Sequence, residues 1–265
     1  MVIIAGILGL AVGSFLNVVI YRVPLRQSVV SPPSACPLCS ARIKGYDNVP
    51  VISWLLLRGK CRTCDSAISA RYPMVELGTA IFFMLVAWKF DSSNSHVVFL
   101  LIAFLYLAAV TIALALIDLS THTLPNAIVF PSYVVGAILL AFDGFASGHQ
   151  RALVRAIIGA TVMGLLYLAM ALMYPDGMGF GDVKFSGVLG LFLGYLGWDV
   201  LVTGAFAAFV LGACYALALI LFKKTNLKSG IPFGPWMVAG AWLGVFFGVQ
   251  IVQSYLSIFS LSSGI

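Results

Sequence analysis

Eight long apolar runs divide this chain, and they limit the folds it can adopt more than any other feature. A helix that crosses a bilayer needs about 20 mostly apolar residues. The chain is 62% hydrophobic and 9% charged, whereas soluble domains are about 25% charged. We therefore predict an all-α polytopic membrane protein with about eight transmembrane helices. The predicted spans are residues 2–21, 72–90, 97–117, 125–145, 152–174, 184–197, 200–222 and 231–256.

A polar insert at residues 22–71 separates the first two runs and is the one sizeable polar stretch of the sequence. The first run lacks the basic residues that open a signal peptide, so we expect it to be retained as a helix. The predicted organisation is a first transmembrane helix at 1–21, a small cytoplasmic insert at 22–71, and a membrane-embedded core at 72–265.

The lysines and arginines predict the orientation, because cytoplasmic loops are rich in them. Eight of the 15 basic residues lie in the insert. With the insert inside, twelve basic residues are cytoplasmic and only Lys89, Arg151 and Arg155 lie outside. Both termini are then outside. The net charge of +6 thus reflects topology and contact with anionic lipid headgroups, and we expect no nucleic-acid partner.

Two aspartates reach the cytoplasmic side in this topology. Asp118 follows the third run and Asp182 precedes the sixth, although the orientation was derived from basic residues alone. Acids at membrane helices are costly and usually functional. We interpret the pair as the catalytic dyad of an intramembrane aspartic protease. The alternatives are solvated interfacial acids or members of an ion or proton path.

The chemistry of such a dyad needs no covalent intermediate. Two carboxylates a few ångströms apart share one proton. The ionised member accepts a proton from water, the water attacks the peptide carbonyl, and the protonated member donates a hydrogen bond to the carbonyl oxygen. Ser14 has no base beside it in its predicted helix. His122 either tunes Asp118 or lies in a loop, and the Leu124-Pro125 pair that follows favours the loop.

Glycines surround Asp182 and continue into the sixth run. Gly179 and Gly181 permit close backbone approach, and together with Lys184 they form the candidate supporting loop of the active site. Four further glycines fall on one face of the predicted helix, a pattern typical of close helix packing. They are Gly187, Gly190, Gly194 and Gly197.

Two C-x-x-C pairs in the insert predict a zinc site. Cys36 and Cys39 are separated by 21 residues from Cys61 and Cys64. Four thiolates complete a tetrahedral zinc site with no open position, so we expect a structural ion. Disulfides are the alternative, which a reducing cytoplasm disfavours. Cys214 lies alone in an apolar run, where we expect it to pack as a small side chain.

Three polar or proline-rich features have less specific interpretations. Glu76 lies in the first turns of the second span and is either an interfacial acid or a functional residue. Asp176 is a loop acid ahead of the glycine motif. The stretch 231–235 contains two prolines, which favours a helix start, and it is a candidate border of the active site.

Taken together, these motifs resemble the bacterial type IV prepilin peptidases, the leader peptidase/N-methyltransferases of pilus and type II secretion systems. The resemblance covers nearly the whole chain. It is carried by Gly13-Ser14-Phe15-Leu16-Asn17, the two Cys pairs, Arg71-Tyr72-Pro73 with Glu76, Asp118 with Leu124-Pro125, Gly179-Phe180-Gly181-Asp182-Val183-Lys184, and Pro232-Phe233-Gly234-Pro235.

The resemblance implies a GxGD-type membrane aspartic protease of the bacterial inner membrane. Such enzymes cleave the basic leader of prepilins or pseudopilins at the cytoplasmic face and then methylate the new N-terminus with S-adenosylmethionine. It implies that Asp118 and Asp182 are catalytic and that the four cysteines bind the metal, and it makes Glu76 a candidate cofactor-binding residue of the methylation half.

Two positions depart from the pattern: Asn126 stands where many relatives have aspartate, and Asp176 where many have glutamate. They leave open whether methylation is retained, so a peptidase without methylation is one alternative. An ion-coupled transporter is another, but such proteins tend to contain internal repeats, and we find none. The sequence contains no glycine-rich βαβ nucleotide pattern and does not indicate the oligomeric state.

Overall fold

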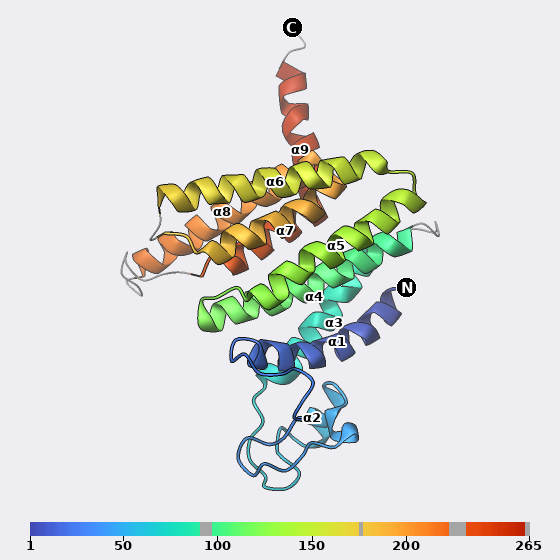
Figure 1. The fold of residues 1–265 in the computed structure, drawn as a ribbon, viewed down its shortest axis with the longest axis vertical. Coiled ribbons are helices and arrows are strands. Elements are labelled where there is room, and N and C mark those ends of the chain that lie inside the picture. Colours follow the sequence, from blue (N-terminus) through green and yellow to red (C-terminus); the bar gives the residue numbers. More distant parts are fainter. Residues whose placement is uncertain (91–96, 175–176, 223–231, 263–265) are drawn as a thin grey trace. The chain divides into compact units, whose positions relative to one another are not determined.

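The chain is helical throughout its regular structure (Figure 1). This computed structural model describes residues 1–90, 97–174, 177–222 and 232–262, and within them only isolated β-bridges are found besides helices. The helical segments are α1 (Val2–Arg22), η1 (Gly45–Asn48), α2 (Ile52–Leu56), α3 (Arg71–Lys89), α4 (Val97–Thr121), α5 (Asn126–Ala146), α6 (Gln150–Met173), α7 (Phe180–Leu196), α8 (Trp198–Leu221) and α9 (Gly234–Ser262). Asp176 and Ile231, noted above, lie outside the described residues.

Each of the eight predicted spans contains one long helix, which confirms the all-α polytopic fold. Among the described residues, six helices are long and apolar enough to cross a membrane: α1, α4, α5, α6, α8 and α9. Helix α7 has only 17 residues, and α3 carries charged side chains at both ends and at Glu76. Eight crossings therefore stay a prediction.

Several helix ends differ from the predicted boundaries; α9, for example, spans Gly234–Ser262 and not 231–256. Two of the differing ends carry a candidate catalytic acid. Helix α4 continues to Thr121, because the hydroxyls of Ser120 and Thr121 donate hydrogen bonds to Ile117 O and let a polar turn follow the apolar run. Helix α7 begins at Phe180 instead of residue 184. Asp118 and Asp182 thus lie inside helices, in the last turn of α4 and the first turn of α7.

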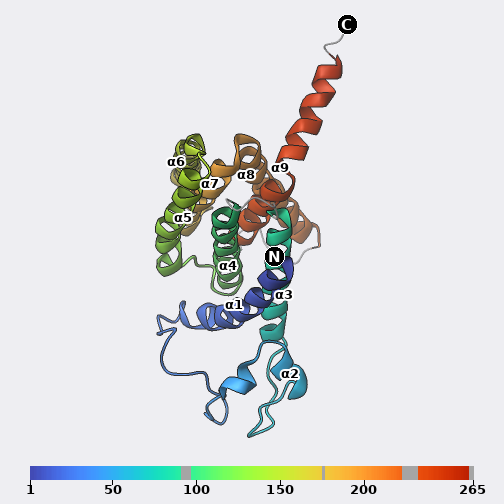
Figure 2. The same cartoon turned by 90° about the vertical axis from the view of Figure 1, so that its right-hand side faces the viewer.

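The chain forms two compact units. The first comprises Met1–Val97 with Phe104–Ala113, and the second comprises Val98–Ala103 with Leu114–Ile265. In the first unit, α1 and α3 pack together in antiparallel directions, with the insert connecting them (Figure 2). Glycines of α1 make this close approach possible, since a Cβ at Gly9 would lie 2.7 Å from Ala80 Cα, and one at Gly13 would lie 2.7 Å from Glu76 Cα.

In the second unit, α7 contacts α5, α6, α8 and α9, and its residues from Phe185 to Tyr195 are buried. The predicted glycine face is confirmed at Gly190 and Gly194, which pack on α6. A Cβ at Gly190 would lie 2.4 Å from Gly159 O. Gly187 instead lies against Tyr133 of α5, and Gly197 follows the end of α7. The four glycines therefore do not serve one contact.

Candidate active site and metal centre

Asp118 is held at the end of α4 by the start of α9. Its side chain is 4% exposed, and its Oδ2 atom accepts a hydrogen bond of 3.0 Å from the backbone N–H of Gly234. A Cβ at Gly234 would lie 2.7 Å from that same oxygen. His122 lies just past α4 with a φ of 53° and donates its N–H to Asp118 O, so the prediction that it ends the helix in a loop is confirmed.

Asp182 lies in the first turn of α7, where the helix dipole favours a negative charge. It is 9% exposed, and its backbone N–H donates to Gly179 O at 3.0 Å. Both acids are buried in the same compact unit, Asp118 at the end of α4 and Asp182 at the start of α7. Two buried carboxylates in one site favour a state with a single shared proton.

The start of α7 meets the residues that lead into α5 beside this site. The predicted supporting loop is wrong for Gly181 and Lys184, which lie in the first turns of α7, and Gly179 is the residue just before the helix. A Cβ at Gly181 would lie 3.1 Å from Leu124 Cβ, so only a minimal side chain fits there. The Lys184 ammonium donates a 3.2 Å hydrogen bond to Asn126 Oδ1 and lies 5.5 Å from the ring centre of Phe130. Asn126, the residue that departs from the pattern, is therefore a partner of Lys184.

An aromatic cluster supports the start of α9. Phe233 lies 6.3 Å from Tyr167 and 5.5 Å from Phe209 between ring centres. The sequence predicted that this proline-rich stretch borders the active site, and Gly234 of this stretch donates a hydrogen bond to the candidate acid Asp118. Tyr167 was missed altogether, because no motif distinguishes it from the other aromatic residues of the apolar runs.

The four cysteines of the insert come together. Their sulfur atoms all lie within 4.8 Å of one another, and the Sγ atoms of Cys36 and Cys64 are 3.8 Å apart. Sulfurs bound to one tetrahedral zinc at 2.3 Å are separated by about 3.8 Å. The predicted ligand set of Cys36, Cys39, Cys61 and Cys64 therefore fits a zinc ion.

Two similar turns present these thiols. In each turn the first cysteine N–H donates to a carbonyl five residues ahead, Cys36 to Ala41 and Cys61 to Ser66. The backbone N–H of Cys39 and the hydroxyl of Ser66 lower the pKa of Cys36 to about 6, whereas hydrogen bonds with the neighbouring thiols raise the pKa of Cys39 to about 11. Metal ligands must be deprotonated, so zinc binding would release a proton from Cys39.

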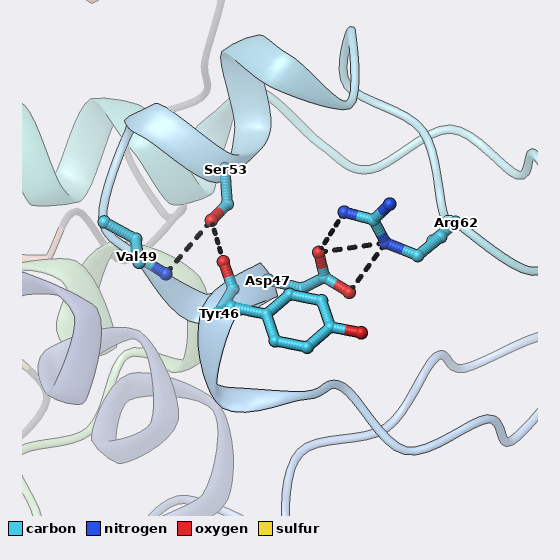
Figure 3. Close-up of polar contacts among 5 residues, drawn as sticks. All are labelled: Tyr46, Asp47, Val49, Ser53 and Arg62. Atoms are coloured by element: carbon cyan, nitrogen blue, oxygen red, sulfur yellow. Dashed lines mark hydrogen bonds and ion pairs between the residues drawn. The ribbon is translucent and has the colours of Figure 1, made fainter.

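A salt bridge ties the second cysteine turn to η1. The Arg62 guanidinium donates to both carboxylate oxygens of Asp47, with a shortest N–O distance of 2.6 Å (Figure 3). The same guanidinium lies over the Tyr46 ring, 5.6 Å from its centre. The hydrogen bonds from Arg62 lower the pKa of Asp47, so the pair stays ionised at neutral pH.

Glu76 lies away from the cysteines, on α3 where α1 packs. It is 8% exposed, and its Oε2 atom accepts a 2.7 Å hydrogen bond from the backbone N–H of Val51. Nearby, the Asn17 side chain donates to Tyr72 O at 3.1 Å. Of these residues, which contributed to the resemblance, Asn17 and Tyr72 join α1 to α3, and Glu76 joins α3 to the insert.

Known protein families and individual relatives match most of the chain. Residues 7–90 match the bacterial peptidase A24 N-terminal domain, and residues 105–217 match the type IV leader peptidase family. The prepilin leader peptidase/N-methyltransferase of Stutzerimonas stutzeri is 35% identical, covering 96% of this chain and 93% of that protein. The chain belongs to the type IV leader peptidase family.

Other relatives of this family give the same result. The protein of the same description in Pseudomonas aeruginosa is 34% identical over 94% of this chain and 91% of its own length, and that of Neisseria gonorrhoeae is 34% identical over 91% and 88%. No solved structure matches the chain. Family membership and six apolar helices make it a multi-pass protein of the bacterial inner membrane.

Proposed function

We propose that this protein removes the basic leader peptide of prepilins or pseudopilins at the cytoplasmic membrane face and then N-methylates the new N-terminal residue. Its relatives are prepilin leader peptidase/N-methyltransferases over nearly the whole chain. The proposed cleavage step rests mainly on one observation: Asp118 and Asp182 are both buried, and they lie at the ends of two different helices.

The proposed cleavage uses these two acids and a water molecule. The ionised carboxylate removes a proton from water, whose oxygen attacks the scissile carbonyl carbon. The protonated carboxylate donates to the carbonyl oxygen, and a proton passes to the leaving amine as the C–N bond breaks. The Gly234 N–H holds one carboxylate in place, and Gly179, Gly181 and Lys184 surround the other at the start of α7.

The charge distribution supports a cytoplasmic site. Twelve of the 15 basic residues fall on the side that contains the insert and both aspartates. Substrates then lie with their own apolar helices in the bilayer and present the leader junction at its inner surface, so the expected partners are prepilins or pseudopilins and membrane lipid.

For methylation we assign S-adenosylmethionine as the donor, because its sulfonium supplies a transferable methyl group. Zinc on the four cysteines holds the insert and takes no part in the transfer, since four protein ligands leave it no open position. Glu76 is the candidate functional residue for methylation, because its buried carboxylate lies on α3 and accepts a hydrogen bond from the insert.

The decisive test is the intact mass of a prepilin after incubation with the purified enzyme and isotope-labelled S-adenosylmethionine. We expect loss of the leader and the gain of one labelled methyl group. Loss of the leader without the methyl group would leave a peptidase alone. An unchanged prepilin that a known peptidase cleaves in parallel would refute the proposal.

A further inference from the structure

The insert contains a strained turn at Val51. Its φ of 60° and ψ of −49°, with the Ile52 N–H donating to Pro50 O, define a classic γ-turn. This conformation is rare in proteins, and a β-branched residue at positive φ is a marked outlier. Strained backbone persists only where surrounding contacts enforce it, and it is concentrated at functional sites.

Contacts on both sides of the turn enforce this strain. On one side, the buried Glu76 carboxylate accepts the Val51 N–H at 2.7 Å. On the other, the Ser53 hydroxyl accepts the Val49 N–H at 3.1 Å and donates to Tyr46 O at 2.9 Å (Figure 3). The loop that precedes α2 is therefore fixed to α3 through a single carboxylate.

This fixed loop forms one wall of an open surface cavity with a volume of about 330 Å³. Asn48 and Pro50 line it from the loop, and four residues line it from α1, namely Ala11, Ser14, Phe15 and Val18. The volume is near the lower end of small-molecule sites. The lining residues carry no charge, so the cavity suits a neutral ring, and any charged part of a ligand would have to lie outside it.

We infer that this cavity binds the adenine ring of S-adenosylmethionine. A primary amide such as that of Asn48 offers a donor and an acceptor to the adenine edge, and an aromatic ring such as Phe15 can stack on a base face. Phe15 is 53% exposed in this structure, so the described part of the chain leaves about half of its surface uncovered. The inference rests on the proposed N-methyltransferase activity and gives that activity a location.

Glu76 then acts as a positioning residue for this site. Its carboxylate already accepts the Val51 N–H, and it is not among the residues that line the cavity. It contributes by holding the γ-turn that presents Asn48 and Pro50. A direct ionic contact with the cofactor would require the negative charge of Glu76. The positioning role requires only an oxygen that accepts the Val51 N–H.

The test is equilibrium binding of S-adenosylhomocysteine, the unreactive product, to the full-length zinc-loaded protein in detergent. Asn48→Ala and Phe15→Leu should each weaken binding about tenfold, the size expected for the loss of one amide–base pair or one stacking contact. Gln27→Ala, an exposed amide of the same insert, and Phe206→Leu, an exposed phenylalanine of α8, are matched controls that should bind normally.

Glu76 requires two variants. Glu76→Gln keeps an oxygen that can accept the Val51 N–H and should bind the ligand like the wild type, whereas Glu76→Ala should lose most of the binding. Equal loss in both would show a direct charge contact and overturn the positioning role. Zinc content and leader cleavage by each variant report whether it is folded.

The two possible failures are distinguishable. A wild-type protein that cleaves prepilin but binds no S-adenosylhomocysteine would remove both the methylation proposal and this site. Wild-type binding that Asn48→Ala and Phe15→Leu leave unchanged would overturn the cavity assignment alone, as expected if a lipid chain occupies it.

Discussion

Gly234 is the residue at which the absence of a side chain matters most to the candidate dyad. Its N–H contacts Asp118 Oδ2 at 3.0 Å, and its Cα approaches so closely that a Cβ would lie 2.7 Å from the same oxygen. A methyl group there must displace either the carboxylate or the start of α9. Displacing a catalytic group by about 1 Å can cost roughly 100-fold in rate.

We therefore expect Gly234→Ala to lower kcat/KM for leader cleavage by about 100-fold. Gly164→Ala on α6 is the matched control, because a Cβ at Gly164 meets no atom within 4 Å. Cleavage of a purified prepilin, followed by gel shift, measures both. Equal activity of the two variants would show that Gly234 does not position the dyad.

The two aspartates themselves give a sharper prediction. Asp118→Asn and Asp182→Asn keep the shape of the side chain but remove a carboxylate that must accept or share a proton, so each should abolish cleavage without unfolding the protein. Helical circular dichroism and binding of uncleaved prepilin test for folding. Substantial cleavage by either variant would rule out the dyad.

Among the helices, α7 is the one whose position determines the site, because Asp182 lies in its first turn. Its other end is fixed by Arg155 of α6, which donates hydrogen bonds to the carbonyls of Gly194 at 2.9 Å, Tyr195 at 2.7 Å and Leu196 at 3.3 Å. A helix leaves its last carbonyls without backbone partners, and the guanidinium satisfies three of them.

Arg155→Ala should therefore reduce stability, by about 1–3 kcal/mol for the loss of charge-assisted hydrogen bonds at a half-buried helix end. Arg151→Ala removes an exposed arginine from the same helix and should have little effect. The thermal unfolding midpoint in detergent is the measurement. Indistinguishable midpoints would mean that solvent replaces the arginine at no cost.

The helices show what hydropathy predicts and what it does not. All eight long helices were located from apolar runs, because the energetics of lipid burial depend on composition alone. The ends of the helices were not located in this way. At the end of α4, for example, the hydroxyls of Ser120 and Thr121 donate hydrogen bonds to Ile117 O in the preceding turn. Helix α7 similarly begins before its apolar run, since Asp182 can be accommodated at a helix N-terminus.

The site divides in the same way. The predicted topology places Asp118 and Asp182 on one side of the membrane, which stays a prediction, whereas the C-x-x-C spacing predicted the cysteine cluster that the structure shows. The contact of Gly234 with Asp118 joins residues 116 positions apart and depends on how α9 packs, which periodicity does not encode. The turn at Val51 was equally unpredictable, because valine disfavours that conformation.

At the scale of the whole molecule, the insert depends on its metal. Its helical segments are only four and five residues long, η1 and α2, and so small a domain usually needs a staple such as a structural metal. Binding energy of structural zinc is then largely folding energy.

Changing Cys36 and Cys61 to Ser should release zinc, expose the insert to proteases and abolish methylation, while leader cleavage continues. Cys214→Ser, an exposed cysteine of α8, should change none of these. Metal analysis and limited proteolysis provide the readouts. A wild-type protein with no stoichiometric zinc and with oxidised thiols would contradict the metal site.

The antiparallel packing of α1 on α3 has a topological consequence for the insert. The chain leaves α1 and re-enters at α3 at neighbouring points, joined by the Asn17 to Tyr72 hydrogen bond. The insert is thus a domain insertion at the turn of a helical hairpin, a kind of site at which insertions are tolerated in many proteins. A short glycine–serine linker in its place should leave the hairpin closed, because the contacts between α1 and α3 do not pass through the insert.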